Sequence, residues 1–139
     1  MVGLLALLTA SAAPYFLGAW QSLRLRAGAQ QLATIVSHAR QIAINQNRQA
    51  CVRPAGQTVQ VLVGTATPCS TGAVWKGVAT DAAGHFRLTE GVRVSAATAS
   101  VVFNYLGAAV TPGAYTVSNP DSNRTRRVVV ATSGRISIR

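Results

Sequence analysis

Residues 23–48, "LRLRAGAQQLATIVSHARQIAINQNR", decide the fold of this chain. Apolar residues recur there at steps of three and four, the spacing that places side chains on one side of an α-helix. Arginines and glutamines fall mostly off this stripe, and no proline occurs between Pro14 and Pro54. The segment therefore predicts an amphipathic helix that packs one side against a domain. The stripe residues are Leu25, Ala29, Leu32, Val36, Ala39 and Ala43.

Residues 1–23 carry no charge. As a helix this segment would reach roughly 30 Å, about the thickness of a bilayer core. We expect one long helix over residues 1–48, with a membrane or filament-core part at 1–23, in which a proline kink is tolerated, and an amphipathic part at 24–48. An alternative is a cleaved secretory signal, because "ASA" at residues 10–12 fits a small-residue cleavage site. The predicted core residues are Leu4, Leu5, Leu7, Leu8, Pro14 and Phe16.

Residues 49–139 predict a β-rich globular domain. The runs "QTVQVLV", "VRVSA", "VVFNYLG", "AYTVSN" and "RRVVVAT" are β-branched or aromatic, and Gly, Pro, Asn and Ser bound them. The expected fold class is therefore α+β, with a long N-terminal helix packed on a C-terminal antiparallel sheet.

The chain closes with "RTRRVVVATSGRISIR" at residues 124–139. Ser133-Gly134 lies between two short alternating runs, which predicts a tight hairpin with glycine at the positive-φ position. In such a hairpin Arg135, Ser137 and Arg139 share one face of the last strand, and the two isoleucines between them point to the other.

The charge is strongly positive. Thirteen Lys+Arg residues oppose Asp81, Glu90 and Asp121, which gives a formal net charge of +10. Such a surface attracts nucleic acid, anionic lipid or an acidic polymer. The terminal arginines are either solvated or face an acidic partner, and composition alone leaves both interpretations open. They are Arg124, Arg126, Arg127, Arg135 and Arg139.

The sequence does not favour an enzyme. Catalysis needs a nucleophile with a base, paired carboxylates or a metal cluster, and the chain offers two histidines and three scattered acids. We interpret His38 as a helix-flank residue and His85 as a loop residue after Gly84. Trp75 is expected to anchor the core rather than to stack on bases. No cofactor, metal or small-molecule substrate is expected.

Cys51 and Cys69 are the only cysteines. Their spacing is too long for a CxxC redox pair, and two thiolates are too few for a zinc site. A disulfide in an oxidising compartment such as a periplasm is the natural interpretation. The alternative is a pair of free buried thiols in a cytosolic protein.

The whole pattern resembles the FimT/GspH family of minor pilins and pseudopilins. The resemblance rests on "APYF" in the apolar helix, "ARQIAINQNR" at the helix end, the cysteine pair, Trp75 and Gly77 in "VWKG", and the terminal Ser-Gly-Arg hairpin. It implies a type IV pilin-like fold, assembly with other pilin or pseudopilin subunits, and an inner-membrane anchor. The implied location is the inner membrane before assembly, then the periplasm or a cell-surface pilus of a Gram-negative bacterium.

Two features depart from that family. The usual prepilin leader, the phenylalanine after cleavage and the glutamate at the fifth mature position are missing, so we expect that the first turn or two of the mature helix lies outside this sequence. DNA-binding members share a Gly-Arg-x-Arg motif in the last hairpin. Here Gly134 and Arg135 match, Ser137 stands at the second arginine position, and Arg139 lies two residues beyond.

Three functions are open, two within this family and one outside it. In the first, the terminal arginine cluster with Gly134 binds DNA without sequence preference for uptake in natural transformation. In the second, the chain is a tip pseudopilin of a type II secretion system, or a pilus-priming subunit, with no DNA role. In the third, it is a secreted β-domain released from its signal.

Overall fold

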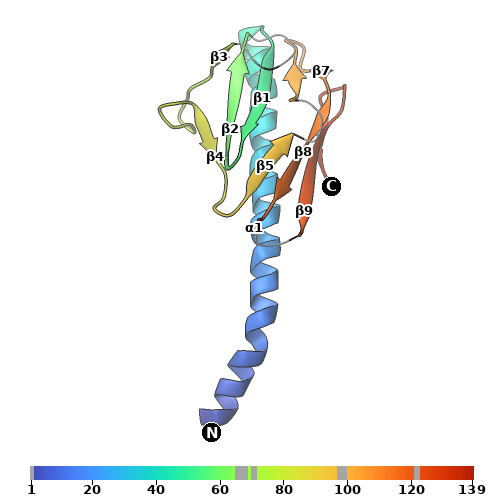
Figure 1. Cartoon of the computed structure of the whole chain (residues 1–139). Helices are drawn as coiled ribbons and strands as arrows, with labels where there is room; N and C mark the ends of the chain where they lie inside the picture. Colours follow the sequence, from blue (N-terminus) through green and yellow to red (C-terminus); the bar gives the residue numbers. More distant parts are fainter. Residues whose placement is uncertain (1, 65–68, 70–71, 97–99, 121–122) are drawn as a thin grey trace.

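One long helix and two antiparallel sheets make up the protein. The computed structural model describes residues 2–64, 69, 72–96, 100–120 and 123–139, with side chains from residue 18 onward. Helix α1 (Val2–Gln46) runs through Pro14 without interruption, as predicted for a single long helix. Figure 1 shows its N-terminal half projecting from a domain that packs along its C-terminal half.

The strands form two sheets, and every pairing is antiparallel. The first sheet has the order β3-β2-β1-β6-β7, with β4 also pairing with β2, and the second has the order β10-β9-β8-β5. This arrangement confirms the predicted α+β fold. The first sheet contains β1 (Ala50–Ala55), β2 (Thr58–Val63), β3 (Ala73–Val74), β4 (His85–Arg87), β6 (Val102–Phe103) and β7 (Ala109–Thr111). The second sheet contains β5 (Arg93–Ala96), β8 (Gly113–Ser118), β9 (Thr125–Val130) and β10 (Ile136–Ile138).

The predicted stripe of α1 faces the core. All six of its residues are buried, with exposed fractions of 4% or less, and Ile35 and Ile42 widen the stripe. Small residues let the helix approach the second sheet closely: a Cβ atom at Gly28 would lie 2.8 Å from Val92 Cγ1. The stripe therefore sets how near the helix lies to the sheet as well as which side of it is buried.

Helix α1 ends in a hydrogen-bonded cap. Asn47 has φ 54°, the left-handed conformation that asparagine tolerates better than most residues. Asn47 N–H donates to the Ile44 carbonyl and Arg48 N–H to the Ala43 carbonyl, the two bonds of a Schellman motif. The chain then turns directly into β1.

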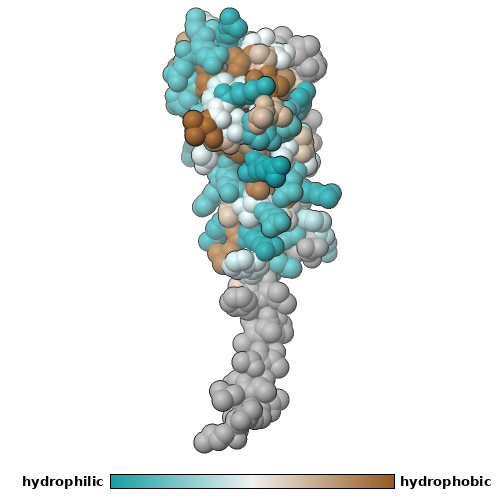
Figure 2. Space-filling view, turned by 90° about the vertical axis from the view of Figure 1, so that its left-hand side faces the viewer, coloured by the Kyte–Doolittle hydropathy of each residue, from teal (hydrophilic) through white to brown (hydrophobic). Residues whose placement is uncertain are grey.

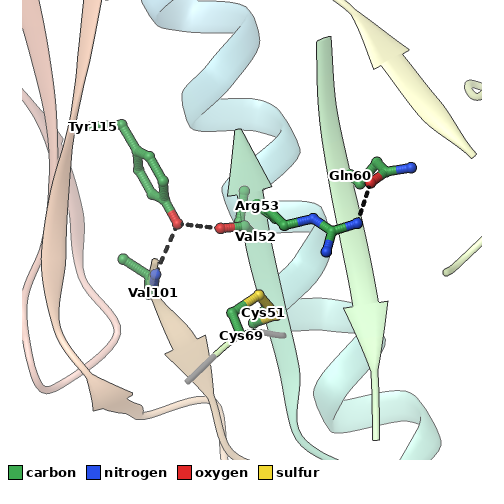
Figure 3. Close-up of a disulfide and its surroundings, with 7 residues drawn as sticks. All are labelled: Cys51, Val52, Arg53, Gln60, Cys69, Val101 and Tyr115. Atoms are coloured by element: carbon green, nitrogen blue, oxygen red, sulfur yellow. Dashed lines mark hydrogen bonds between the residues drawn. A yellow bond between two sulfur atoms is a disulfide. The ribbon is translucent and has the colours of Figure 1, made fainter. Parts of the chain in front are cut away.

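A buried tyrosine joins the two sheets (Figure 3). Tyr115 lies on β8 of the second sheet and is fully buried. Its hydroxyl donates to the Val52 carbonyl of β1 at 2.6 Å and accepts a hydrogen bond from Val101 N–H at 2.8 Å. Burial raises the pKa of Tyr115, while the Val101 N–H lowers it to a smaller extent. The hydroxyl therefore stays protonated and keeps its donor role well into the alkaline range.

Cys51 and Cys69 form a disulfide, as predicted (Figure 3). Cys51 is fully buried in β1 and packs with Leu62 and Val102 in a small apolar cluster of its own. Two residues further along β1, the Arg53 guanidinium donates to Gln60 Oε1 of the paired residue on β2, at 2.6 Å.

Two sequence interpretations were wrong in detail. His85 is the first residue of β4 rather than a loop residue, because it pairs with Gln60 of β2. The run "VVFNYLG" is strand only at β6. Its extension as a strand fails because Asn104 Oδ1 accepts hydrogen bonds from Leu106 N–H and Ala108 N–H, which turns the chain.

In the part of the chain with described side chains, no helix combines the length and the apolar character needed to cross a membrane. The predicted membrane or filament-core part at residues 1–23 lies mostly outside that part. Its backbone is helical from Val2 on. The side chains of Leu4, Leu5, Leu7, Leu8, Pro14 and Phe16 lie outside the described residues.

The domain surface is mainly hydrophilic on the face that Figure 2 shows, where apolar residues form small patches separated by polar ones. The main apolar core is enclosed between α1 and the two sheets.

Removing the Tyr115 hydroxyl tests the bridge between the sheets. Tyr115→Phe leaves the Val52 carbonyl and the Val101 N–H without their shared partner, so we expect a loss of about 1–3 kcal/mol of unfolding free energy at pH 7. Tyrosine in an unfolded chain has a pKa of about 10. The wild type should therefore lose stability above that pH, because the unfolded chain releases the tyrosine proton and the folded chain keeps it. The variant should lack this step. Denaturant midpoints from pH 7 to 11 measure both effects, with exposed Tyr105→Phe as the control. An unchanged midpoint would contradict the bridge.

Removing the disulfide tests its contribution to stability. The cysteines are 18 residues apart, and closing a loop of this length stabilises a fold by about 3 kcal/mol. We expect Cys51→Ala/Cys69→Ala to lose about that much in urea unfolding. Reductant should destabilise the wild type by a similar amount and leave the double variant unaffected. If reductant changes nothing in the wild type, the disulfide does not stabilise the domain.

Candidate nucleic-acid interface

The β9–β10 hairpin closes through a three-residue loop. Gly134 N–H donates to the Ala131 carbonyl, and Ala131 N–H donates to the Arg135 carbonyl, both at 2.9 Å. Gly134 has φ 86°, the left-handed conformation that such loops require at this position. The predicted hairpin is therefore present, with Thr132, Ser133 and Gly134 as its loop.

Two arginines lie directly opposite each other across this hairpin. Arg127 N–H donates to the Arg139 carbonyl at 2.9 Å, and Arg139 N–H donates to the Arg127 carbonyl at 2.8 Å. Residues that exchange both bonds have Cα atoms about 5.5 Å apart and side chains on the same face. Both side chains are exposed. The pair therefore presents two guanidinium groups side by side.

Strand alternation sorts the remaining candidates. Arg135 lies two steps from Ser137 and four from Arg139, so it shares their face, and it is exposed. Arg126 pairs with buried Val117 and lies on the opposite, helix-facing side of the sheet. Arg124 precedes β9 and is exposed. The structure thus brings Arg127, Arg135 and Arg139 to one face and places Arg126 on the other.

The same face continues across the second sheet. Arg127 pairs with Thr116 of β8, and Ser118 of β8 pairs with Arg93 of β5. Arg93 is therefore a fourth arginine on this face, about 12 Å from Arg127 by strand spacing. Sequence reasoning missed it because only the strand order places β5 beside β8. Hydroxyl side chains lie between these arginines, at Ser95, Thr116, Ser118, Thr125 and Ser137. We call these arginines and hydroxyls the arginine face.

The arginine face carries several positive charges close together. Like charges directly opposite on a sheet repel each other. Among the described residues, no Asp or Glu side chain lies within ion-pair distance of Arg127, Arg135 or Arg139. An anion between the guanidinium groups would remove this repulsion and accept hydrogen bonds from the arginines and hydroxyls.

The hairpin loop packs on a second loop, between β6 and β7. A Cβ atom at Gly134 would lie only 2.1 Å from the Gly107 carbonyl oxygen, so no larger residue fits there. Ala109 N–H donates to the Thr132 carbonyl at 3.0 Å. From α1, Arg40 Nε donates to the same Gly107 carbonyl at 2.8 Å. The glycine that begins the Gly-Arg match therefore has a packing role.

The other candidate groups have structural roles. Trp75 and Phe86 stack with rings parallel within 1°, and the edge of His38 meets Trp75 at 4.8 Å. Trp75 thus anchors the core beside α1, as predicted. Asp81 Oδ1 accepts hydrogen bonds from His85 N–H and Ala83 N–H, and these bonds lower its pKa against the opposing effect of desolvation. In the described part of the chain no cluster of His, Cys, Asp and Glu could hold a metal ion.

Comparison with known proteins gives a family match. A family model described as "Type II transport protein GspH" matches residues 28–134, well over half of the chain. That segment contains the amphipathic half of α1 and the sheet domain up to the hairpin glycine. No curated protein matches the chain.

Solved structures share the fold. The solution structure of Escherichia coli GspH has a TM-score of 0.66 at 15% identity and covers 84% of this chain and 88% of its own. The Pseudomonas aeruginosa type IV minor pilin FimU has a TM-score of 0.61 at 16% identity, with 83% and 87% covered. The minor pseudopilin EpsH from the type 2 secretion system of Vibrio cholerae has 0.60 at 15%, with 83% and 95% covered. At these identities the likeness shows the type IV pilin-like fold alone.

Gly134→Ala tests the contact between the two loops. The new Cβ combines positive-φ strain with a clash against the Gly107 carbonyl, so we expect a loss of about 2–4 kcal/mol of unfolding free energy. Gly56→Ala is the matched control, because Gly56 has φ 69° but no atom within 4 Å of its would-be Cβ. It should lose only about 1–2 kcal/mol. Equal losses in urea unfolding would show that the clash contributes nothing.

Proposed function

This chain belongs to the GspH family, as a minor pilin or pseudopilin of a type IV pilus or type II secretion machine, and from that premise we propose that its arginine face binds DNA. Like other members, it is a subunit that assembles with pilins in the cell envelope. In the proposed role the bound DNA is extracellular and is taken up by a type IV pilus in natural transformation. Before assembly the subunit sits in the inner membrane, and afterwards it belongs to a pilus that reaches the periplasm and the cell surface.

The observation that carries this proposal is the Arg127–Arg139 pair. Two guanidinium groups held side by side suit successive or bridging phosphate contacts, since the planar fork of arginine binds phosphate oxygens bidentately. Arg135 extends the pair along the hairpin, and Arg93 extends it across the sheet. A spacing of about 12 Å from Arg127 to Arg93 is close to the width of the major groove, so phosphates on both of its sides come within reach.

The composition of the arginine face favours binding without sequence preference. Base edges are read by amide, carboxylate or arginine side chains that enter a groove, and single strands are held by aromatic stacking. Apart from Ala114 and Val129, the described strand positions on this side of the second sheet hold arginines and hydroxyls, and neither aromatic nor amide side chains. On the outer surface of a sheet, outside a groove, arginines and hydroxyls contact phosphates and sugars, which position the DNA and carry no sequence information.

A second candidate is a pseudopilin at the tip of a type II secretion system, or a pilus-priming subunit, with no DNA role. The match to the type II transport protein GspH favours it. In that case the arginine face contacts neighbouring subunits or water.

The experiment compares duplex DNA binding by the full chain in detergent at several salt concentrations. Arg127→Gln/Arg139→Gln should weaken binding and reduce the slope of log K against log salt by about two, because each lost phosphate contact removes about 0.9. Arg26→Gln/Arg48→Gln is the matched control, since both residues are exposed and lie outside the sheets, Arg26 on α1 and Arg48 two residues beyond its end. Arg93→Gln should reduce the slope by about one.

Equal losses in both double variants would mean that the wild type binds through net charge alone. No binding by the wild type near physiological salt would leave the secretion pseudopilin as the better candidate.

A further inference from the structure

Arg40 contacts the β6–β7 loop, on which the loop of the β9–β10 hairpin packs. It lies on α1, half-buried, and belongs to none of the four strands that build the face. Its Nε–H donates to the Gly107 carbonyl at 2.8 Å, across 67 positions of sequence. The sequence pattern does not predict this contact between the helix and the loop.

The accepting carbonyl lies at a three-way junction. Gly107 belongs to the β6–β7 loop, and Gly134 of the β9–β10 loop packs directly on its carbonyl. Both glycines are buried. The two would-be Cβ atoms each lie 3.0 Å from Arg40 Nε. Arg40 therefore contacts a carbonyl on which the hairpin loop packs, beside the glycine that precedes Arg135.

A buried carbonyl needs a partner, and water has little access between these loops. Arginine suits this place because its planar guanidinium directs Nε–H at one acceptor and leaves its remaining donors free on the other side. The bond fixes the β6–β7 loop against α1. Through the Gly107–Gly134 packing and the Ala109–Thr132 hydrogen bond, it also fixes the β9–β10 loop.

We infer that Arg40 is a positioning residue for the arginine face. It holds the hairpin loop against α1, so that Arg135 and Arg139 keep their places beside Arg127, and it does not itself contact phosphate. This inference rests on the proposed DNA binding. It also gives the Gly-Arg match a physical reason: the glycine lets the loop sit on the carbonyl that Arg40 holds.

The test uses the full chain in detergent with a 20–30 base-pair duplex as probe. Arg40→Met keeps the length of the side chain and removes its donors and charge. Arg48→Met is the matched control, because it removes the same charge from an exposed position just beyond the end of the same helix. Arg40→Lys keeps a charge and a donor. Three readouts are measured: duplex affinity at several salt concentrations, the melting temperature, and hydrogen exchange of the Ala109 and Gly134 amides.

We expect Arg40→Met to bind the duplex about fivefold more weakly than Arg48→Met at a temperature where both are folded, a difference of about 1 kcal/mol. Its salt slope should equal that of Arg48→Met, since no phosphate contact is lost. The Ala109 and Gly134 amides should exchange about tenfold faster, because the loops open locally. Arg40→Lys should recover most of the affinity.

Two outcomes overturn the inference. If the salt slope of Arg40→Met falls by about 0.9 relative to the control, Arg40 is a phosphate contact. If only the melting temperature changes, Arg40 is a structural residue without influence on the face. Failure of the proposed function looks different: the wild type then does not bind the duplex, or Arg127→Gln/Arg139→Gln binds it no more weakly than the helix control, whereas amide exchange still reports whether Arg40 holds the loops.

Discussion

The contact between the narrow stripe of α1 and the two sheets is the constraint on which the rest of the fold depends. Strands as short as β3, β6 and β10 bury little surface by themselves, and a small sheet needs packing against a helix for stability. The helix supplies that surface to both sheets at once, and the Tyr115 hydroxyl ties the sheets to each other. The two sheets therefore keep a fixed position relative to each other, because both pack on α1.

The helix-facing side of the second sheet is buried against α1, and its outer side is left to charged and polar residues. Alternation along β9 and β10 directs Val128, Val130 and the two isoleucines toward α1, and it directs Arg127, Arg135 and Arg139 away from it. The contacts of the hairpin at its loop and on its inner face offset the repulsion between neighbouring guanidinium groups. A basic site can be dense here because the packing that holds it lies on the other side.

Much of this fold could be predicted from sequence. Period-3.6 spacing gave the buried stripe of α1, β-branched runs gave β2, β5, β8 and β9, and Ser133-Gly134 gave the hairpin. Local patterns failed where pairing or side-chain hydrogen bonds decide: β1 contains Pro54, and Asn104 turns a run that looks like strand. For the candidate site, the shared face of Arg135 and Arg139 followed from alternation. The places of Arg93 and Arg40 did not, because strand order and loop-to-loop packing join residues far apart in the chain.

β10 is the edge strand of its sheet, and its ends carry Arg135 and Arg139. Unpaired backbone groups on an edge strand invite pairing with a strand of another molecule, and proteins prevent this with very short edges and with charges beside them. A three-residue strand between two arginines has both protections. The same cations thus disfavour a sheet-to-sheet junction at this edge between two copies of the chain, a contact that short strands can form in more than one register.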